Sequence, residues 1–193
     1  MKYYIEITLL PAIEIPIYFL WEKVYQQIHL ALVEVQDGEG KVHIGASLPE
    51  YDAKQHKLGS KLRLLSSSIN DLENLKIQKW LSRLTDYIHV STIRNVPEKI
   101  QGYAFFKRIQ TKSSNARLAR RKAKRDGVSV EEALRVLNKR KEQTSKAPYI
   151  RMKSQSTDKR YRLMIGYEEA EQKSNIESFT TYGLSSKTPI PIF

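Results

Sequence analysis

Hydrophobic residues follow two different periods near the N-terminus. Over Tyr3–Leu9, apolar side chains alternate with polar ones, which is typical of a half-buried strand, and Pro11 ends the pattern. From Ile17 to Leu32 the apolar residues recur every three or four positions, and a turn follows at residues 37–40. The chain is therefore predicted to open with a strand and an amphipathic helix.

The next fifty residues repeat this order with one more strand. Alternation over residues 42–46 and around Leu62–Leu64 predicts two strands joined by a polar loop. Ser68 and Asp71 resemble a capping box, and the apolar positions after them predict a second helix that continues to Leu84. A fourth strand is predicted over residues 87–90.

The predicted order of strand, helix, strand, strand, helix, strand is the ferredoxin-like arrangement, which RNA-recognition domains share. We expect it to form a domain over residues 1–97, ending at a break around Asn95–Pro97. The expected class is α+β, with a divergent second region over residues 98–193. Because this fold hosts many functions, it does not by itself indicate one.

The second region begins with a strand over residues 103–110, in which Arg108 and Gln110 are expected to point to the same side. The run Ala116–Arg125 consists of good helix formers and stops at Asp126-Gly127. Ser129 and Glu132 are expected to cap a further helix that continues to Lys141.

The last fifty residues are predicted to form short strands. Residues 149–156 and 161–167 are expected to pair as a hairpin around 157–160, and residues 168–175 are expected to be a linker. A last strand is expected to end at Tyr182-Gly183, and the tail Pro189–Phe193 is expected to pack down through its apolar residues.

Composition excludes several classes of chemistry. With 193 residues, of which 40% are apolar, the chain is long enough to bury a core. It has no cysteine, which excludes disulfides, thiolate metal sites and a cysteine nucleophile. The stretch Lys2–Leu10 lacks a cleavage site and no apolar run is long enough to span a membrane, so we expect a cytoplasmic protein without a membrane partner.

Charge is concentrated in the second half. Residues 1–97 carry 11 basic and 11 acidic residues, whereas residues 98–193 carry 22 and 10 and so hold the entire net charge of +12. A solvated basic face explains most small imbalances, but one of this size indicates a polyanionic partner.

The basic helix Ala116–Arg125 favours nucleic acid over lipid as that partner. Basic residues cover most of its circumference, and beyond Leu118 and a few alanines it lacks the apolar face that a membrane-surface helix needs. We therefore expect phosphate contacts from this helix and from the segment before it, made by Lys112, Arg117, Arg120, Arg121, Lys124 and Arg125.

Several side chains have both a structural and a catalytic interpretation. His29 lies at the flank of the apolar stripe of the first helix, where position alone favours a structural histidine. The hydroxyls of residues 154–157 are typical of a turn, and Tyr182 could be a core aromatic. Neither the histidines nor the acidic residues form a pattern of metal ligands, so we expect no metal and no other cofactor.

The combination of motifs favours the catalytic interpretation of these side chains, because the motifs taken together resemble those of the type I-F CRISPR endoribonucleases that process repeat RNA. The resemblance spans essentially the whole chain and includes the opening strand and the basic helix. It is carried by the following segments: Ile28–Leu32, Ile44–Pro49, Arg151–Thr157, Tyr161–Leu163 and Phe179–Ser185.

The resemblance implies a role for each matching residue. His29 would be the general base, Ser154 would position the attacking ribose, and Tyr182 would orient His29. Arg108 and Gln110 would read bases near the foot of a repeat hairpin. Ser156 is expected to contact the same RNA.

Tyr161 would stack beneath the terminal base pair, although phenylalanine is the residue expected at this position in the family. Lys122, Lys124 and Ala119 stand where more arginine is expected, which should weaken contacts that depend on the bidentate guanidinium.

The activity implied is metal-independent cleavage at the base of the hairpin by the ribose 2′-hydroxyl, leaving a 2′,3′-cyclic phosphate and a 5′-hydroxyl. The product would stay bound as a guide RNA and join the other subunits of a type I-F surveillance complex. Two alternatives remain: a non-catalytic protein that binds structured RNA, and a structural subunit that binds RNA after processing.

Overall fold

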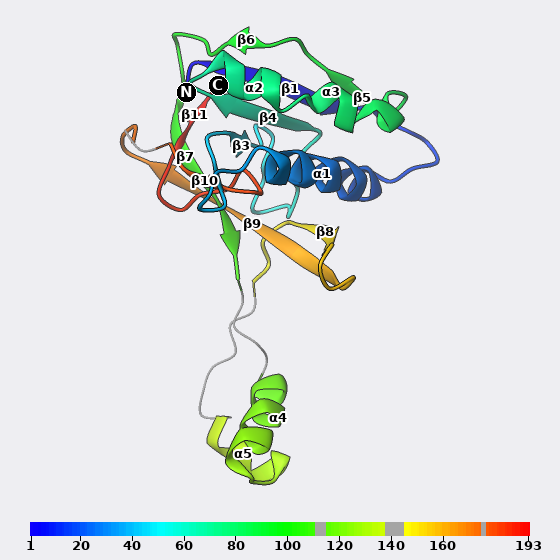
Figure 1. Ribbon diagram of the computed structural model, residues 1–193, viewed down its shortest axis with the longest axis vertical. Coiled ribbons are helices and arrows are strands. Elements are labelled where there is room, and N and C mark those ends of the chain that lie inside the picture. The colour runs from blue at the N-terminus through cyan, green and yellow to red at the C-terminus, as the bar shows by residue number, and fades with distance from the viewer. Residues whose placement is uncertain (111–114, 138–144, 175–176) are drawn as a thin grey trace. The chain divides into compact units, whose positions relative to one another are not determined.

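A computed structural model describes residues 1–110, 115–137, 145–174 and 177–193 (Figure 1). The chain divides into two compact units, which are described separately. The first unit joins Met1–Arg108 to Ala147–Phe193, and the second is Ile109–Lys146. This division differs from the expected boundary at residue 97. The reason is that one core holds Ile5 and Ile28 from before residue 97 together with Phe106, Leu163 and Ile190 from after it.

The first sheet of the first unit has the strand order β3-β4-β1-β5, and all three pairs are antiparallel. Its strands are β1 (Tyr3–Leu9), β3 (Gly45–Ser47), β4 (Lys61–Ser66) and β5 (Ile88–Val90). The short strand β6 (Arg94–Asn95) also pairs with β1. The predicted opening strand and the strands at Leu62 and residue 87 are confirmed in this sheet.

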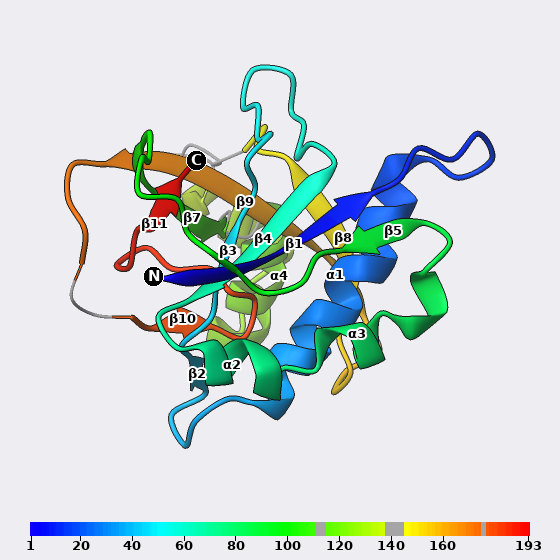
Figure 2. The ribbon, with the colours of Figure 1, turned by 90° about the horizontal axis from the view of Figure 1, so that it is seen from above.

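Helix α1 (Ile17–Glu34) contacts β1, and Figure 2 shows it running beside the sheet. The predicted periodicity of this helix is confirmed, because its buried residues follow a spacing of three and four. They are Leu20, Trp21, Val24, Tyr25, Ile28, Ala31 and Leu32.

The predicted second helix is broken into three pieces: α2 (Ile69–Asn74), α3 (Ile77–Trp80) and the 3-10 helix η1 (Ser82–Leu84). The break comes at Lys76, whose φ of 46° is left-handed and interrupts helical geometry. The expected capping box is wrong as well. Ser68 precedes α2 without a side-chain cap, and Asp71 instead accepts a hydrogen bond of 2.6 Å from the hydroxyl of Ser66.

The predicted strand over residues 42–46 is two strands in different sheets. Strand β2 (Lys41–Val42) pairs with β10 (Phe179–Thr180), whereas β3 pairs with β4. Between them His43 is exposed, and its Nδ1 donates to the Glu177 carbonyl at 2.9 Å, because a carbonyl oxygen can only accept.

A second large sheet has the order β11-β7-β9-β8. Its strands are β7 (Gly102–Ile109), β8 (Tyr149–Lys153), β9 (Arg160–Ala170) and β11 (Ile190–Ile192). The predicted hairpin is confirmed as β8 and β9, but β9 continues to Ala170, so the expected linker from residue 168 begins too early. The tail packs down as expected: β11 pairs with β7, and the Phe193 ring lies 5.0 Å from that of Tyr4.

The second unit contains two helices, α4 (Asn115–Asp126) and α5 (Val130–Leu137). They pack through Ala119, Ala123 and Ala133, around which Val128, Leu134 and Leu137 are half-buried. The predicted stop is confirmed at Gly127, whose φ is +69° and whose amide donates to the Ala123 carbonyl. The Ser129 hydroxyl accepts from the Glu132 amide at 3.1 Å, as the predicted cap requires. Residues 138–141 lie outside the described part of the chain.

Candidate active site and RNA interface

His29 and Tyr182 lie face to face in the first unit. Their ring centroids are 4.2 Å apart and the planes differ by 9°. His29 comes from α1 and Tyr182 from the turn that follows β10, so two segments distant in sequence meet here. The pairing predicted from the resemblance is therefore present as a direct ring contact.

Helix α1 holds the chain segment after β10 through two side chains that lie four residues apart. The Tyr25 hydroxyl donates to the Tyr182 carbonyl at 2.9 Å, and Nδ1 of His29 lies 2.8 Å from the Thr181 carbonyl. Residues four apart project from the same face of a helix, which lets both reach consecutive carbonyls. Sequence reasoning missed Tyr25, although its spacing from His29 was visible.

Gly183 lets the turn approach the first sheet. Its φ is +70°, and a Cβ there would lie 2.8 Å from the Cβ of Ala46. The Gly183 carbonyl accepts a hydrogen bond of 2.8 Å from the Ala46 amide. Any larger residue would displace the turn that carries Tyr182.

The contact with Thr181 fixes the proton on the His29 ring. A carbonyl oxygen can only accept, so Nδ1 carries the hydrogen, and in the neutral ring Nε2 keeps its lone pair. Burial lowers the pKa of His29 below 6.5, the hydrogen bond to Thr181 raises it, and the nearby Arg108 cation lowers it. At neutral pH the ring is therefore mainly in the form that accepts a proton at Nε2.

Tyr161 and Arg108 complete the cluster. The Tyr161 hydroxyl lies 2.6 Å from the Tyr182 hydroxyl, and burial together with this contact raises the pKa of Tyr161. The Arg108 guanidinium lies 5.4 Å from the centre of the Tyr182 ring and 5.7 Å from that of Tyr161. Strand β7, the turn after β10, strand β9 and helix α1 thus each supply one side chain.

Ser154 lies in the β8–β9 turn. Its hydroxyl is 3.2 Å from that of Ser156 and accepts from the Thr157 amide at 3.3 Å. In the described part of the chain these two hydroxyls bond within the turn and not to His29 or Tyr182. The turn is nevertheless anchored to the histidine's helix, since the Lys153 amide donates to Oε1 of Gln26 at 3.0 Å.

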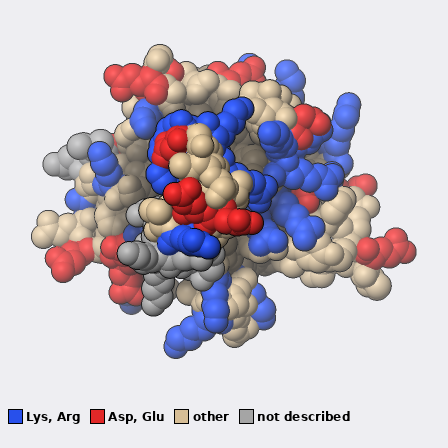
Figure 3. Space-filling model, turned by 90° about the horizontal axis from the view of Figure 1, so that it is seen from below, with Lys and Arg blue, Asp and Glu red and all other residues tan. Residues whose placement is uncertain are grey.

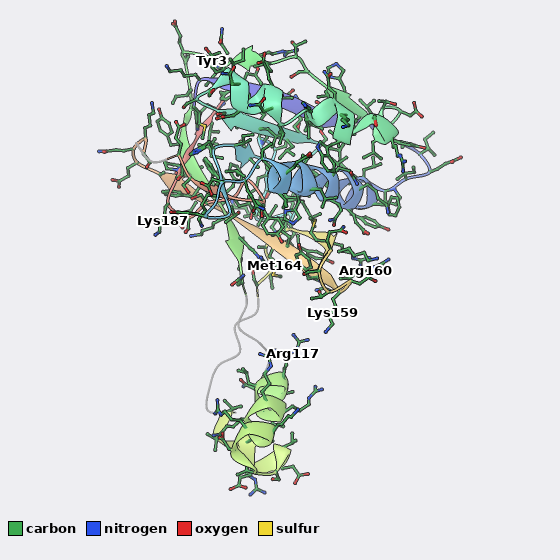
Figure 4. All side chains as sticks on the ribbon, in the orientation of Figure 1. Tyr3, Arg117, Lys159, Arg160, Met164 and Lys187 are labelled. Carbon is green, nitrogen blue, oxygen red and sulfur yellow. The ribbon has the colours of Figure 1, made fainter. Side chains whose placement is uncertain are left out.

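Helix α4 presents most of the predicted phosphate ligands to solvent, and Figure 4 labels Arg117 near its start. The exposed members are Arg117, Arg120, Arg121, Lys124 and Arg125. Arg125 is already paired, because its Nε donates to Asp126 at 2.7 Å, and Lys122 also contacts Asp126.

Two further predicted RNA ligands, Gln110 and Lys112, lie between β7 and α4 in the sequence. Gln110 is exposed and follows the end of β7, and it belongs to the second compact unit, whereas Arg108 ends the first. Lys112 lies outside the described residues.

The first unit carries basic side chains of its own. Figure 3 shows Lys and Arg side chains gathered toward the right, where the β8–β9 hairpin lies. Among the described residues, no group of three His, Asp or Glu side chains is placed to hold a metal ion. No described helix is long and apolar enough to cross a membrane.

Comparisons with known proteins match the whole chain. The profile of the family "CRISPR-associated protein (Cas_Csy4)" matches residues 4–193. Two relatives, from Escherichia coli (strain UTI89 / UPEC) and Pseudomonas aeruginosa (strain UCBPP-PA14), are each named CRISPR-associated endonuclease Cas6/Csy4. Each is 32% identical over 193 residues, which cover all of this chain and all of the relative.

Two solved structures align over the full chain at low similarity. One, a Cas6-related protein from Pyrococcus furiosus, is 14% identical with a TM-score of 0.37 and is covered over 99% of its length. The other, described as a RAMP protein binding different RNA substrates, is 13% identical with a TM-score of 0.36 and is covered completely.

Proposed function

The chain belongs to the Cas_Csy4 family of CRISPR-associated proteins, and on that premise we propose that it is an endoribonuclease that cuts precursor CRISPR RNA at the base of the repeat hairpin. The observation that carries the proposal is the fixed His29 ring. Its Nδ1 donates to Thr181 and its face stacks on Tyr182, so Nε2 alone remains to take a proton.

The reaction uses a nucleophile that RNA supplies itself. Nε2 of His29 removes the proton of the ribose 2′-hydroxyl, and the 2′-oxygen attacks the adjacent phosphorus. The bond from phosphorus to the 5′-oxygen breaks, leaving a 2′,3′-cyclic phosphate on one product and a 5′-oxygen that takes up a proton on the other. No step requires a metal, and a general base of this kind typically contributes ~10²- to 10⁴-fold.

The neighbours of His29 serve as positioning residues. Tyr182 fixes the ring plane by stacking, and Tyr161 holds Tyr182 through the contact between their hydroxyls. Tyr161 also offers its ring to the terminal base pair. Ser154 exchanges its bonds within the turn for one to the ribose, which aligns the attacking oxygen.

Binding of the hairpin is assigned to other side chains. The exposed cations of α4, together with Lys112, neutralise backbone phosphates, while Arg108 and Gln110 read base edges and Ser156 contacts the RNA beside Ser154. The order β3-β4-β1-β5 supports a ferredoxin-like assignment for the first sheet. The product stays bound as a guide RNA and is delivered to the other subunits of a type I-F surveillance complex.

Incubating the protein with hairpin RNA in excess EDTA tests the proposed chemistry. We expect one cut at the foot of the stem, with a 2′,3′-cyclic phosphate and a 5′-hydroxyl, and no cut when the nucleotide 5′ of that position carries 2′-deoxyribose. Loss of cutting in EDTA that magnesium restores would refute this mechanism. Tight binding with intact RNA under every condition would identify a non-catalytic RNA-binding protein instead.

A further inference from the structure

A large groove lies on the first unit beside the candidate active site. It has a volume of about 1080 Å³ and is bounded by α1, by the segment from α2 to η1 and by the β8–β9 turn. These elements lie side by side in Figure 2. None of the residues assigned above to catalysis or to RNA binding lines it, so the groove has no role in the site already described.

The lining of the groove is strongly basic. Two acidic residues, Glu22 and Glu34, line the groove. The basic residues in the lining are six: Lys23, Lys76, Lys79, Arg83, Lys153 and Arg160. All six cations are exposed, and Figure 4 labels Arg160 at the projecting turn. Lys153 is paired with Asp158 at 2.5 Å, but in the described part of the chain the other five have no ion pair. Four of the six cations come from residues 1–97, which are neutral overall, so these four are a local concentration of positive charge.

Two further groups suit a nucleic acid with unpaired bases. Trp80 is half-buried in the wall and leaves part of its ring open to a stacking base. Gln26 also lines the groove. The Lys153 amide fixes its amide orientation, and its Nε2 is buried with no partner, which leaves a donor for a ligand to satisfy.

Two residues that line the groove are close in sequence to residues assigned to the proposed cut. Gln26 lies three residues before His29, almost one helical turn away, and Gln155 follows Ser154 directly. An RNA strand whose scissile phosphate lies between His29 and Ser154 would therefore continue into the groove, which is lined by the same helix α1 and β8–β9 turn.

We propose that this groove binds the single-stranded RNA on the 3′ side of the cut, the segment that leaves with the new 5′-hydroxyl. The inference rests on the proposed function for the position of the cut. Cations at intervals along the groove meet successive phosphates, and Trp80 stacks on one base without selecting its sequence. An acidic protein segment would match the charge but would leave the open ring of Trp80 without a specific partner.

Binding to uncleavable hairpins tests the inference without requiring turnover. Three RNAs are compared, and all carry 2′-deoxyribose at the position of the cut. The first is a blunt hairpin that ends at the stem, the second has six added nucleotides on the 3′ side, and the third has six added nucleotides on the 5′ side. We expect the 3′ extension to tighten binding by about 5- to 50-fold, from one stacked base and a few phosphate contacts. The 5′ extension should change affinity by less than about 2-fold.

The double variant Lys79→Ala, Arg83→Ala should lose most of this gain while binding the blunt hairpin like the parent. The matched control Arg94→Ala, Lys99→Ala removes the same charge from exposed positions outside the groove and should keep the gain. Trp80 provides a second measurement, since the only other tryptophan, Trp21, is buried. The 3′ extension should quench the fluorescence of the parent but not that of Trp80→Phe.

An equal gain from both extensions, or full gain in the groove variant, would overturn the proposal. So would the absence of any gain together with quenching of Trp80 by an acidic peptide, which would make the groove a protein-binding surface. Each of these results can occur whether or not the protein cuts a hairpin RNA that carries the ribose 2′-hydroxyl and a 3′ extension, so failure of this proposal is distinguishable from failure of the proposed chemistry.

Discussion

The two compact units differ in how they place their side chains. In the first, His29 and Tyr182 are held by contacts among several elements over a large core that includes Ile28 and Phe179. In the described part of the second, the buried apolar side chains are three alanines between two helices, and most of the surface of α4 is charged. General base catalysis requires a ring held in one position, whereas phosphates are attracted by charge over a range of positions. This difference predicts that chemistry depends on the first unit and affinity largely on the second.

The largest effect is expected from His29→Ala. The cleavage rate should fall by ~10²- to 10⁴-fold, because the proton acceptor is lost, while hairpin affinity stays within a few-fold of the parent. Cleavage assays and filter binding on one RNA measure both. His89→Ala, at an exposed position of β5, is the matched control and should cut normally. Full cutting by the His29 variant would remove this residue from the mechanism.

The next largest effect is expected from Arg120→Ala combined with Arg121→Ala. Binding should weaken by about 10- to 100-fold for every hairpin, and the slope of log affinity against log salt should flatten by about one to two units. A salt titration against two hairpins of different sequence measures this. The pair Arg94→Ala, Lys99→Ala serves as the control for charge and should keep the parental slope. An unchanged slope in the α4 variant would show that these arginines do not meet phosphates.

A smaller effect, on specificity, is expected from Arg108→Ala or Gln110→Ala. Either should narrow the preference for the native hairpin over one with its lowest base pairs exchanged by ~1 to 3 kcal/mol, with little change in salt slope. Competition binding with the two hairpins measures the preference. Equal losses for both hairpins would show that these side chains do not read bases.

Tyr161→Phe should slow cleavage modestly without changing affinity for the hairpin. The ring remains for stacking, but the 2.6 Å contact with the Tyr182 hydroxyl is lost. A bond of this kind is worth ~0.5 to 1.5 kcal/mol, so cleavage at saturating protein should slow by about 2- to 12-fold at unchanged affinity. Tyr149→Phe, at an exposed position of β8, should leave both quantities unchanged. A saturated rate equal to that of the parent would show that Tyr161 acts through its ring only.

The smallest expected effect is on the pH profile. The base must be neutral, so the rate rises with pH through the pKa of His29 and is flat above it. Burial and Arg108 lower that pKa, so the midpoint should lie below 6.5. Arg108→Ala removes one of these causes and should move the midpoint upward. Single-turnover rates from pH 5 to 8 measure it, and a midpoint above 6.5 in the parent would contradict the environment described for His29.

Periodicity predicted the long elements and missed those that depend on tertiary contacts. Helix α1 and strand β1 were predictable because their buried faces repeat along the sequence. The break at Lys76 was not, since no glycine or proline marks its left-handed backbone. The domain boundary at residue 97 followed a change in charge, which is a surface property, whereas the shared core of Ile28 and Leu163 joins the segments on either side.

The resemblance to the type I-F CRISPR endoribonucleases is confirmed by the family match over residues 4–193. It led to His29 and Tyr182, which position alone did not distinguish from core residues, and they do stack. It did not reveal the hydrogen bond from Tyr25 or the one between the hydroxyls of Tyr161 and Tyr182, because those depend on how the turn after β10 lies against α1.

The most direct test of the division between the two units is the cleavage rate at saturating protein. It is measured in a single turnover for the parent, for His29→Ala and for the Arg120→Ala, Arg121→Ala double variant, at concentrations that bind all the RNA. We predict that the double variant cuts at the parental rate once it is saturated, while His29→Ala remains slower by at least ~10²-fold. A saturated rate for the double variant that falls as far as that of His29→Ala would contradict the account.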